Sequence, residues 1–238
     1  MTFDEFKKIV SISKKEISRQ IWETNRSAIK VKKEEKVIGN LIKIFDAALE
    51  ISNAKGFQAM SMRDLSAKSR LSMGAIYSYF SSKDELLHLL QMQGRQIANK
   101  VLIDQISLVE GPTQKLRIAI QTHVYLSEIM QPWFYFTYIE ARNLAKDERK
   151  KAIESELYTE KIFIDILTEG AELGVFKISN IVLTASLIKA MLQDWYLKRW
   201  KYQKRKINVD DYAEFIIGII ESYLSGKVKG VEHAGFNR

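Results

Sequence analysis

Apolar residues recur at steps of three and four along almost the whole chain, which is the spacing of one face of an α-helix. The pattern is clear over residues 37–55, and we find no convincing run of the alternating apolar and polar residues that a half-buried strand shows. Two prolines and 11 glycines in 238 residues leave few positions that interrupt helices. The sequence therefore predicts an all-α fold.

Capping signals divide the first hundred residues into short helices. Ser61 is followed three residues later by Asp64, and Ser82 by Glu85, and both pairs have the form of a capping box. Ser72 is a further candidate N-cap. We expect helices over residues 37–55, 61–69, 72–80 and 83–105.

Longer helices are expected after the Gly-Pro pair at residues 111–112. Asn208, followed by Asp211, is another capping signal, and Gly170 and Gly174 mark the close of a long segment. The expected helices cover residues 113–130, 132–145, 148–172, 179–204 and 209–225.

The charge of the chain is concentrated at its N-terminal end. The net charge is +8, and residues 1–80 hold 15 Lys and Arg against 9 Asp and Glu, which gives +6. The remaining residues hold 22 against 20, which gives only +2. A basic N-terminal third favours a polyanionic partner such as DNA, although a solvated basic surface would have the same composition.

The sequence lacks the residues that several enzyme classes need. There is no cysteine, and so no disulfide, thiol nucleophile or thiolate metal site. The Glu85-Leu-Leu-His88 pair falls short of the two Glu-x-x-His motifs of helical di-iron enzymes. His123 is interpreted as a hydrogen-bonded structural group. We expect no enzyme activity, no cofactor and no metal.

The apolar runs are short. None approaches the ~18 residues of a membrane span, and the N-terminus lacks the apolar block of a signal peptide. We expect a cytoplasmic protein that does not bind membranes.

The segment from Ile44 to Leu87 reads IFDAALEISNAKGFQAMSMRDLSAKSRLSMGAIYSYFSSKDELL. It resembles the DNA-binding domain of the tetracycline-repressor (TetR) family in several spaced elements, namely AAxE with KGF, SMRDLSAKS, LSMGAIYSYF and SSKDELL. The resemblance implies a three-helix head with a helix-turn-helix at about 61–80, and a larger C-terminal helical domain. The implied domains are a basic helical extension at 1–35, a DNA-binding domain at 36–96, and a ligand-binding and dimerisation domain at 97–238.

The resemblance also implies contacts with double-stranded operator DNA. A recognition helix must expose small or polar residues to enter the major groove, and Ser72, Gly74 and Ala75 suit that edge. Tyrosine hydroxyls can donate to phosphates, and Lys83 would lie at a helix start, where backbone N–H groups also bind phosphate. The residues implied to contact DNA are Ser61, Arg63, Ser72, Met73, Gly74, Ala75, Tyr77, Tyr79 and Lys83.

Four residues of this segment have alternative interpretations. Tyr77 and Tyr79 are each either a DNA contact or a partly buried packing aromatic, and Met73 is either a base reader or a spacer. Arg70 stands where the family usually has glycine. It would adopt a positive φ at some energetic cost, or it would add a phosphate contact.

The N-terminal extension is longer than the family minimum. Its cations suggest a DNA-binding arm. Its apolar residues Phe6, Ile9, Ile17 and Trp22 recur at helical spacing, which favours packing against the protein.

The resemblance is looser beyond residue 113. The stretch ILTEGAELGVF resembles the end of the family's seventh helix, which implies that the two helices after it form the interface of a homodimer. Twofold symmetry suits two recognition helices that enter successive major grooves. The candidate interface residues are Ile188, Met191, Leu192, Ile216, Ile220 and Tyr223.

Aromatic residues in the C-terminal part are candidates for binding a small-molecule effector, since such sites are mostly apolar with a few polar groups. The same residues at helical spacing would also suit a plain hydrophobic core. The candidate ligand-binding residues are Trp133, Phe136, Phe163, Trp195, Tyr196 and Arg199.

The segment DWYLKRWKYQKRK combines aromatic and basic residues. It resembles the corresponding part of family members that sense fatty acyl-coenzyme A, whose phosphates such cations would bind. A solvated helix end is the alternative. The implied effector is an acyl-CoA or another lipid-like or aromatic molecule.

Together these features predict a repressor that releases operator DNA when an effector shifts the helix at about 83–105. The opposite sign, in which the effector promotes DNA binding, stays open. A non-sensing architectural or partner-binding helical protein is the alternative from another class.

Overall fold

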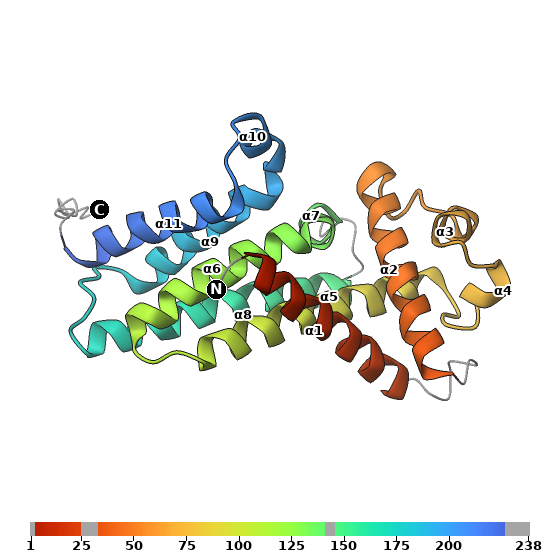
Figure 1. The fold of residues 1–238 in the computed structure, drawn as a ribbon, viewed down its shortest axis with the longest axis horizontal. Helices are drawn as coiled ribbons and strands as arrows, with labels where there is room; N and C mark the ends of the chain where they lie inside the picture. The colour runs from red at the N-terminus through yellow and green to blue at the C-terminus, as the bar shows by residue number, and fades with distance from the viewer. Residues whose placement is uncertain (1–2, 25–32, 141–145, 227–238) are drawn as a thin grey trace. The chain divides into compact units, whose positions relative to one another are not determined.

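The computed structural model describes residues 3–24, 33–140 and 146–226, and over these ranges the chain contains helices and no strand. The predicted all-α fold is confirmed (Figure 1). The helices are α1 (Phe3–Thr24), α2 (Glu34–Lys55), α3 (Met62–Ser69), α4 (Met73–Ile76), α5 (Lys83–Ser107), α6 (Pro112–Ile129), α7 (Gln131–Glu140), α8 (Lys146–Glu172), α9 (Ile181–Leu197), α10 (Arg199–Lys204) and α11 (Val209–Leu224).

The chain packs as two compact units. The first comprises Met1–Ile103 and Leu126–Ser155, and the second comprises Asp104–Tyr125 and Glu156–Arg238. Helices α5, α6 and α8 therefore contribute to both units. The domain boundaries expected at residues 35 and 96 stay a prediction. They divide the chain into consecutive segments, whereas each packing unit combines two separate segments of the chain.

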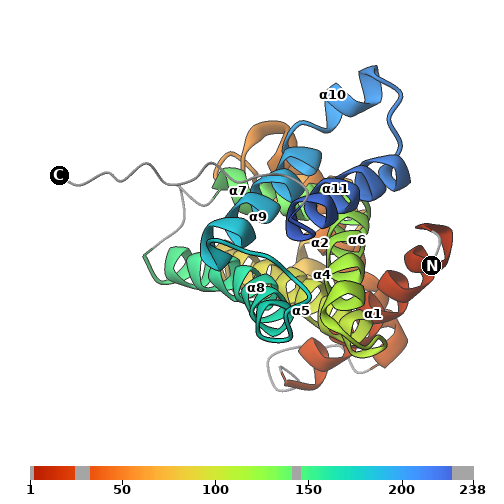
Figure 2. The same cartoon turned by 90° about the vertical axis from the view of Figure 1, so that its left-hand side faces the viewer.

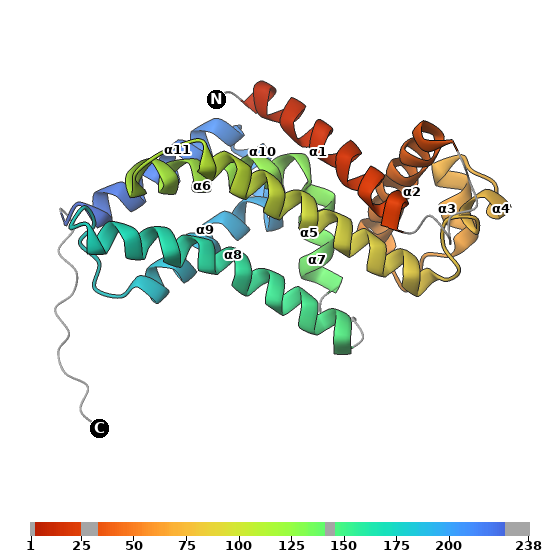
Figure 3. The same ribbon diagram turned by 90° about the horizontal axis from the view of Figure 1, so that it is seen from below.

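In the first unit the N-terminal extension is a helix that packs on the protein. Phe6, Ile17 and Trp22 of α1 are buried, and the buried Gln93 amide of α5 donates a 2.7 Å hydrogen bond to the Ser18 hydroxyl. Figure 3 shows α1 alongside α2 and α5. The packing interpretation of this segment is confirmed over Phe3–Thr24, whereas residues 25–32 lie outside the described residues.

A glycine allows α7 to approach α5 closely in the first unit. A Cβ atom built on Gly94 would lie only 1.9 Å from Nε1 of Trp133. The indole ring therefore occupies the space that any other side chain at position 94 would fill. This contact fixes α7 against α5.

In the second unit α9 and α11 run side by side (Figures 1 and 2). Trp195 of α9 packs between two tyrosines, with ring-centroid distances of 5.0 Å to Tyr202 and 4.7 Å to Tyr212. The Tyr212 hydroxyl donates to the Met191 carbonyl at 2.6 Å. These contacts form an aromatic core at the junction of α9, α10 and α11.

Two predicted helices have different bounds in the structure. The segment expected at 179–204 is two helices, α9 and α10, that meet at Lys198. The helix expected at 72–80 is only α4, which ends at Ile76, and turn residues follow it. The helix expected at 132–145 is described as far as Glu140, and residues 141–145 lie outside the described residues. None of the helices within the described ranges combines the length and the hydropathy that crossing a membrane requires.

Candidate nucleic-acid interface and ligand-binding residues

Helix α3 begins with the predicted capping box. The Ser61 hydroxyl accepts from the Asp64 backbone N–H at 3.1 Å, and the Asp64 carboxylate accepts from the Ser61 backbone N–H at 2.8 Å. Hydrogen bonds from Lys55 and from Ser61 hold the pKa of the Asp64 carboxyl well below its usual range. The start of α3 is thus defined by its own local sequence.

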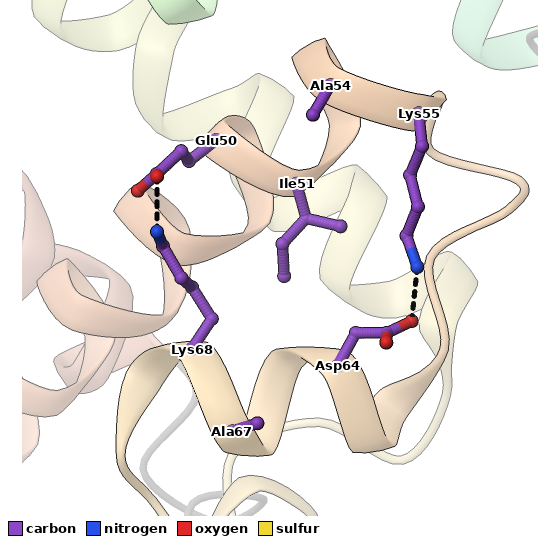
Figure 4. A pocket seen from close by; sticks show the side chains of 7 residues that line it. All are labelled: Glu50, Ile51, Ala54, Lys55, Asp64, Ala67 and Lys68. Carbon is purple, nitrogen blue, oxygen red and sulfur yellow. Dashed lines mark hydrogen bonds and ion pairs between the residues drawn. The ribbon is translucent and has the colours of Figure 1, made fainter.

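Two ion pairs hold α3 against α2. Lys55 pairs with Asp64 at 2.7 Å near one end of α3, and Lys68 pairs with Glu50 near the other. Figure 4 shows both pairs on either side of a hollow lined by Ile51 and two alanines. The pairs are exposed and each contributes little to stability, but together they set the orientation of α3 on α2.

The turn after α3 confirms the expectation for Arg70. Its backbone has φ 58° and ψ 34°, which is the left-handed region. The Ser66 hydroxyl donates to the Leu71 carbonyl across the turn at 2.6 Å. Ser72 then caps α4 by accepting from the Ala75 N–H at 3.2 Å. These side-chain hydrogen bonds stabilise the turn, although Arg70 stands where the family usually has glycine.

The predicted DNA-contacting residues form a largely exposed edge. Tyr77 is 48% exposed, and Ser61, Arg63, Ser72 and Gly74 are exposed, whereas Met73, Ala75 and Lys83 are half-buried. Nothing lies within 4 Å of a Cβ built on Gly74, so the backbone there is open to close approach by another molecule. Such an edge of small and polar groups can enter a major groove.

Tyr79 does not belong to this edge, and its prediction as a DNA contact is wrong in this structure. Its side chain is 2% exposed, and its hydroxyl accepts a buried hydrogen bond of 2.8 Å from the Asn40 amide. Burial raises the pKa of the Tyr79 phenol. The alternative interpretation, a packing aromatic that joins the recognition segment to α2, is the one the structure supports.

Lys83 lies at the start of α5, as expected. Its ammonium group donates to the Gln58 carbonyl at 2.8 Å and lies 5.0 Å from the centre of the Phe57 ring. Ser82 caps the helix by accepting from the Glu85 N–H at 3.1 Å. The cation is thus held in place beside the first turn of α5.

The candidate ligand-binding residues fall into both units. Trp133 and Phe136 lie on α7 in the first unit, where Phe136 packs edge-on against Phe57 at 6.0 Å. Phe163, Trp195, Tyr196 and Arg199 belong to the second unit. All five aromatic residues are buried.

The basic segment around α10 is partly neutralised by one carboxylate. Lys198 pairs with Asp194 at 2.6 Å, and Lys201 and the Tyr202 hydroxyl also bond to Asp194. Burial would raise the pKa of the Asp194 carboxyl, but these hydrogen bonds hold it well below its usual range. Arg199 stacks on Trp195 at 4.5 Å. Lys204, Arg205 and Lys206 are exposed.

The sequence analysis missed a buried lysine in the second unit. Lys189 of α9 is 5% exposed, and its ammonium group lies 3.4 Å from Glu156 and 3.5 Å from Nε2 of His123. Burial lowers the pKa of Lys189, against the attraction of Glu156 and Glu160. Burial, and then the charge of Lys189, lower the pKa of His123 well below 6.5. A lysine in the largely apolar segment of residues 181–192 was the signal that could have revealed this cluster.

Four of the six candidate dimer residues face the protomer's own core. Ile188, Leu192, Ile216 and Ile220 are buried within the chain, and Met191 and Tyr223 are half-buried. The exposed apolar residues of α9 and α11 are different ones, with Leu187 65% and Phe215 69% exposed. The four buried residues are thus wrong as a surface, because a helix with apolar residues on both sides gives no sign of which side faces in. Met191 and Tyr223 stay predictions. The exposed apolar set is Val182, Leu183, Leu187, Phe215 and Ile219.

These observations define a class of protein: a helix-turn-helix regulator with a helical C-terminal region. The chain belongs to the TetR family of transcriptional regulators, because residues 44–90 match the model of the bacterial regulatory proteins of the tetR family and residues 109–220 match a tetracyclin repressor-like C-terminal domain. Residues 3–24 of α1 precede both matched ranges.

Relatives and solved structures agree with this assignment. The HTH-type transcriptional regulator HbdR of Aromatoleum sp. (strain CIB) is 21% identical over 78% of this chain and 81% of its own length. FadR of Bacillus subtilis in complex with stearoyl-CoA has a TM-score of 0.62 at 22% identity, covering 76% of this chain and 98% of FadR. AibR in complex with isovaleryl coenzyme A and operator DNA has a TM-score of 0.66 at 15% identity, covering 76% and 97%. At these identities the structures show a shared fold.

Proposed function

We propose that this regulator represses transcription by binding operator DNA as a homodimer, and that it releases the operator on binding a small hydrophobic or amphipathic effector. The exposed edge of Arg63, Ser72, Gly74 and Tyr77 is the single observation that carries the DNA-binding half of the proposal. This edge offers small groups to the groove and hydrogen-bond donors to the phosphates. Ser61, Met73, Ala75 and Lys83 complete the proposed contact set.

The proposed dimer forms through the exposed apolar residues of α9 and α11. Large apolar side chains that are exposed together on one surface mark a site that binds another molecule. Leu187 and Phe215 would lie at the centre of the interface, and Ile188 and Ile216 would support it from the protomer's core.

An acyl-CoA is the first effector class to test. FadR and AibR, which share the fold, were solved with acyl-CoA molecules. The chain itself supplies the buried cation Lys189 and the exposed cations of residues 204–206 for anionic groups. Phe163, Trp195, Tyr196 and Arg199 are the proposed effector-binding residues of the second unit, and Trp133 and Phe136 those of the first.

The test begins with selection of an operator from a random pool of DNA duplexes. Binding of the selected duplex is then measured with palmitoyl-CoA, free CoA or palmitate present. We expect sequence-specific binding that palmitoyl-CoA alone weakens at least tenfold. Failure to select any sequence would overturn the DNA-binding half. Specific binding that acyl-CoAs leave unchanged would overturn acyl-CoA as the effector.

A further inference from the structure

Helix α11 has a glycine on its exposed side that has no packing role within the protomer. Gly218 lies in the interior of α11 and is exposed, and nothing lies within 4 Å of a Cβ atom built on it. Glycine inside a helix is unfavourable compared with alanine, because its backbone loses more conformational freedom on folding. The part of the chain that the structure describes therefore leaves room for a side chain that the sequence does not supply.

The residues beside Gly218 form an exposed apolar surface. Phe215, one turn before it on α11, is 69% exposed, and Ile219 is 45% exposed. Leu187 is 65% exposed on α9, which runs beside α11 (Figures 1 and 2). Residues 215–220 read FIIGII and carry no charge. Such a surface is suited to another apolar protein surface and not to a polyanion.

A second copy of this chain is the occupant that these features favour. Gly218 lies among the exposed apolar set of α9 and α11, which the proposed function assigns to a homodimer. A position for the twofold axis therefore rests on that proposed dimer. In a symmetric dimer each protomer uses the same surface, so a residue on the twofold axis meets its own copy. The spacing of two packed helices depends on the side chains at their contact, and glycine allows the closest approach.

The sizes of the neighbouring side chains favour an antiparallel crossing. When two copies of α11 cross in opposite directions at Gly218, the residue one turn before it faces the residue one turn after it on the other copy. Phe215 then lies over Ser222 of the partner subunit, so that a large ring meets a small, exposed side chain. In a parallel crossing Phe215 would instead meet the partner's Phe215 in the narrow space beside the two glycines.

We propose that the twofold axis of the homodimer passes at Gly218, where α11 of each protomer crosses its copy in the opposite direction with the two backbones in close contact. Phe215 and Ile219 pack around this crossing, beside Leu187 of α9. This arrangement specifies which helix pair meets at the axis and which residue sets the spacing of the pair. The assignment of an apolar surface to a dimer specifies neither.

Helix geometry makes the arrangement specific to one position. Helices that pack ~10 Å apart, with Cα atoms ~2.3 Å from each helix axis, bring two facing Cα atoms to about 5 Å from each other. A disulfide joins residues whose Cα atoms lie ~4.4–6.8 Å apart. In the antiparallel crossing Ser222 lies ~6 Å along α11 from the axis, so the two copies of Ser222 are about 12 Å or more apart. A cysteine at position 218 can therefore reach its own copy, whereas one at position 222 cannot.

The first test is disulfide cross-linking, for which the full chain is suited because it contains no cysteine. Gly218→Cys is expected to form a cross-linked dimer under mild oxidation at least tenfold faster than Ser222→Cys or Gly39→Cys, as followed by non-reducing electrophoresis. Gly39 is the matched control, since it is a glycine inside α2 with open space around a Cβ atom. Native mass spectrometry of the unmodified chain separates the two ways to fail. A dimer in which Gly218→Cys cross-links no faster than the controls would overturn the axis position and leave the proposed dimer intact, whereas a monomer would overturn both.

The second test is a larger side chain at the crossing. Gly218→Leu keeps the surface apolar, introduces a better helix former and has room within the protomer. We expect the dimer dissociation constant to rise at least tenfold in sedimentation, with an unchanged circular dichroism spectrum, and Gly39→Leu to leave the constant unchanged. If Gly218→Leu fails to fold, Gly218→Ala decides, with an expected rise of at least threefold. A folded variant that dimerises as tightly as the wild type would show that the two helices do not approach closely at Gly218, and would refute the proposal.

Discussion

The exposed edge of the helix-turn-helix and the exposed edge of α9 and α11 differ in kind. The first presents small and polar groups, such as Ser72, Gly74 and the Tyr77 hydroxyl, whereas the second presents large apolar side chains such as Leu187 and Phe215. Hydrogen-bond donors and a backbone open to close approach favour binding to a polyanion such as DNA. Exposed apolar area favours binding to another protein surface, because its burial stabilises the complex. The contrast teaches that one chain carries two exposed surfaces of different chemistry, and the proposed function assigns DNA to the first and a second protomer to the other.

The largest effect is expected from a charged residue placed in the exposed apolar set of α9 and α11. Leu187→Glu is expected to give monomers in native mass spectrometry and sedimentation, because the charge would lose its hydration in the interface. Operator affinity should fall about 100-fold, as paired binding is lost. Leu173→Glu, at an exposed leucine outside α9 and α11, is the matched control. A dimeric Leu187→Glu protein would show that the interface lies elsewhere.

The second effect concerns the buried cation Lys189 of α9. Lys189→Met is expected to weaken acyl-CoA binding at least tenfold, about 1.4 kcal/mol, while operator binding without effector stays intact. Thermal stability should change little, since the loss of one partner of an ion pair is severe only when the charge left behind is buried, and Glu156 is 47% exposed. Lys161→Met, at an exposed lysine of α8, is the control. Unchanged acyl-CoA affinity in Lys189→Met would remove Lys189 from the effector site.

Two tyrosines sharpen the comparison at the DNA-binding edge. Tyr77→Phe should weaken operator binding about fivefold through loss of one hydrogen bond, about 1 kcal/mol, with no change in melting temperature. Tyr79→Phe should instead lower the free energy of unfolding by about 1–3 kcal/mol, because the Asn40 amide loses its buried acceptor. Operator titrations and denaturant unfolding measure the two effects. If Tyr79→Phe weakened operator binding and Tyr77→Phe lowered the free energy of unfolding, the Tyr79 side chain would have to turn outward when DNA binds.

The smallest effect is a dependence of stability on pH. Because the pKa of His123 is lowered in the folded protein, the unfolded chain takes up a proton first as the pH falls below about 6.5, and stability is lost in that range. Melting temperatures between pH 7.5 and 5.5 should therefore fall more steeply for the wild type than for His123→Gln. His88→Gln, whose histidine lies on α5, should retain the wild-type slope.

Local features of the DNA-binding segment could be predicted from the sequence. The capping box of Ser61 and Asp64, the Ser72 cap and the left-handed Arg70 all depend on groups within a few residues of one another, and all appear in the structure. The outcome differs for Tyr77 and Tyr79. Their positions two residues apart in an irregular turn do not reveal which one points inward.

Which side of each C-terminal helix faces the core could not be predicted from the sequence, for a related reason. Helix α9 carries apolar residues around most of its circumference, so Leu187 and Ile188 look equivalent in the sequence although one is exposed and the other buried. The ion pair between the buried Lys189 and Glu156 joins residues that are 33 positions apart in the sequence (189 − 156 = 33). Such contacts depend on how helices pack, which periodicity does not specify.

The contact between Gly94 and Trp133 limits how helices of the first unit can move. A slip of α5 by one residue would advance it about 1.5 Å and rotate it about 100°, which would bring the side chain of Gln93 or Arg95 to the place of the indole ring. Sliding α5 along α7 therefore requires the indole ring to move, whereas tilting α5 about Gly94 does not. We expect motion of α5 within this unit to be a tilt about the contact between Gly94 and Trp133.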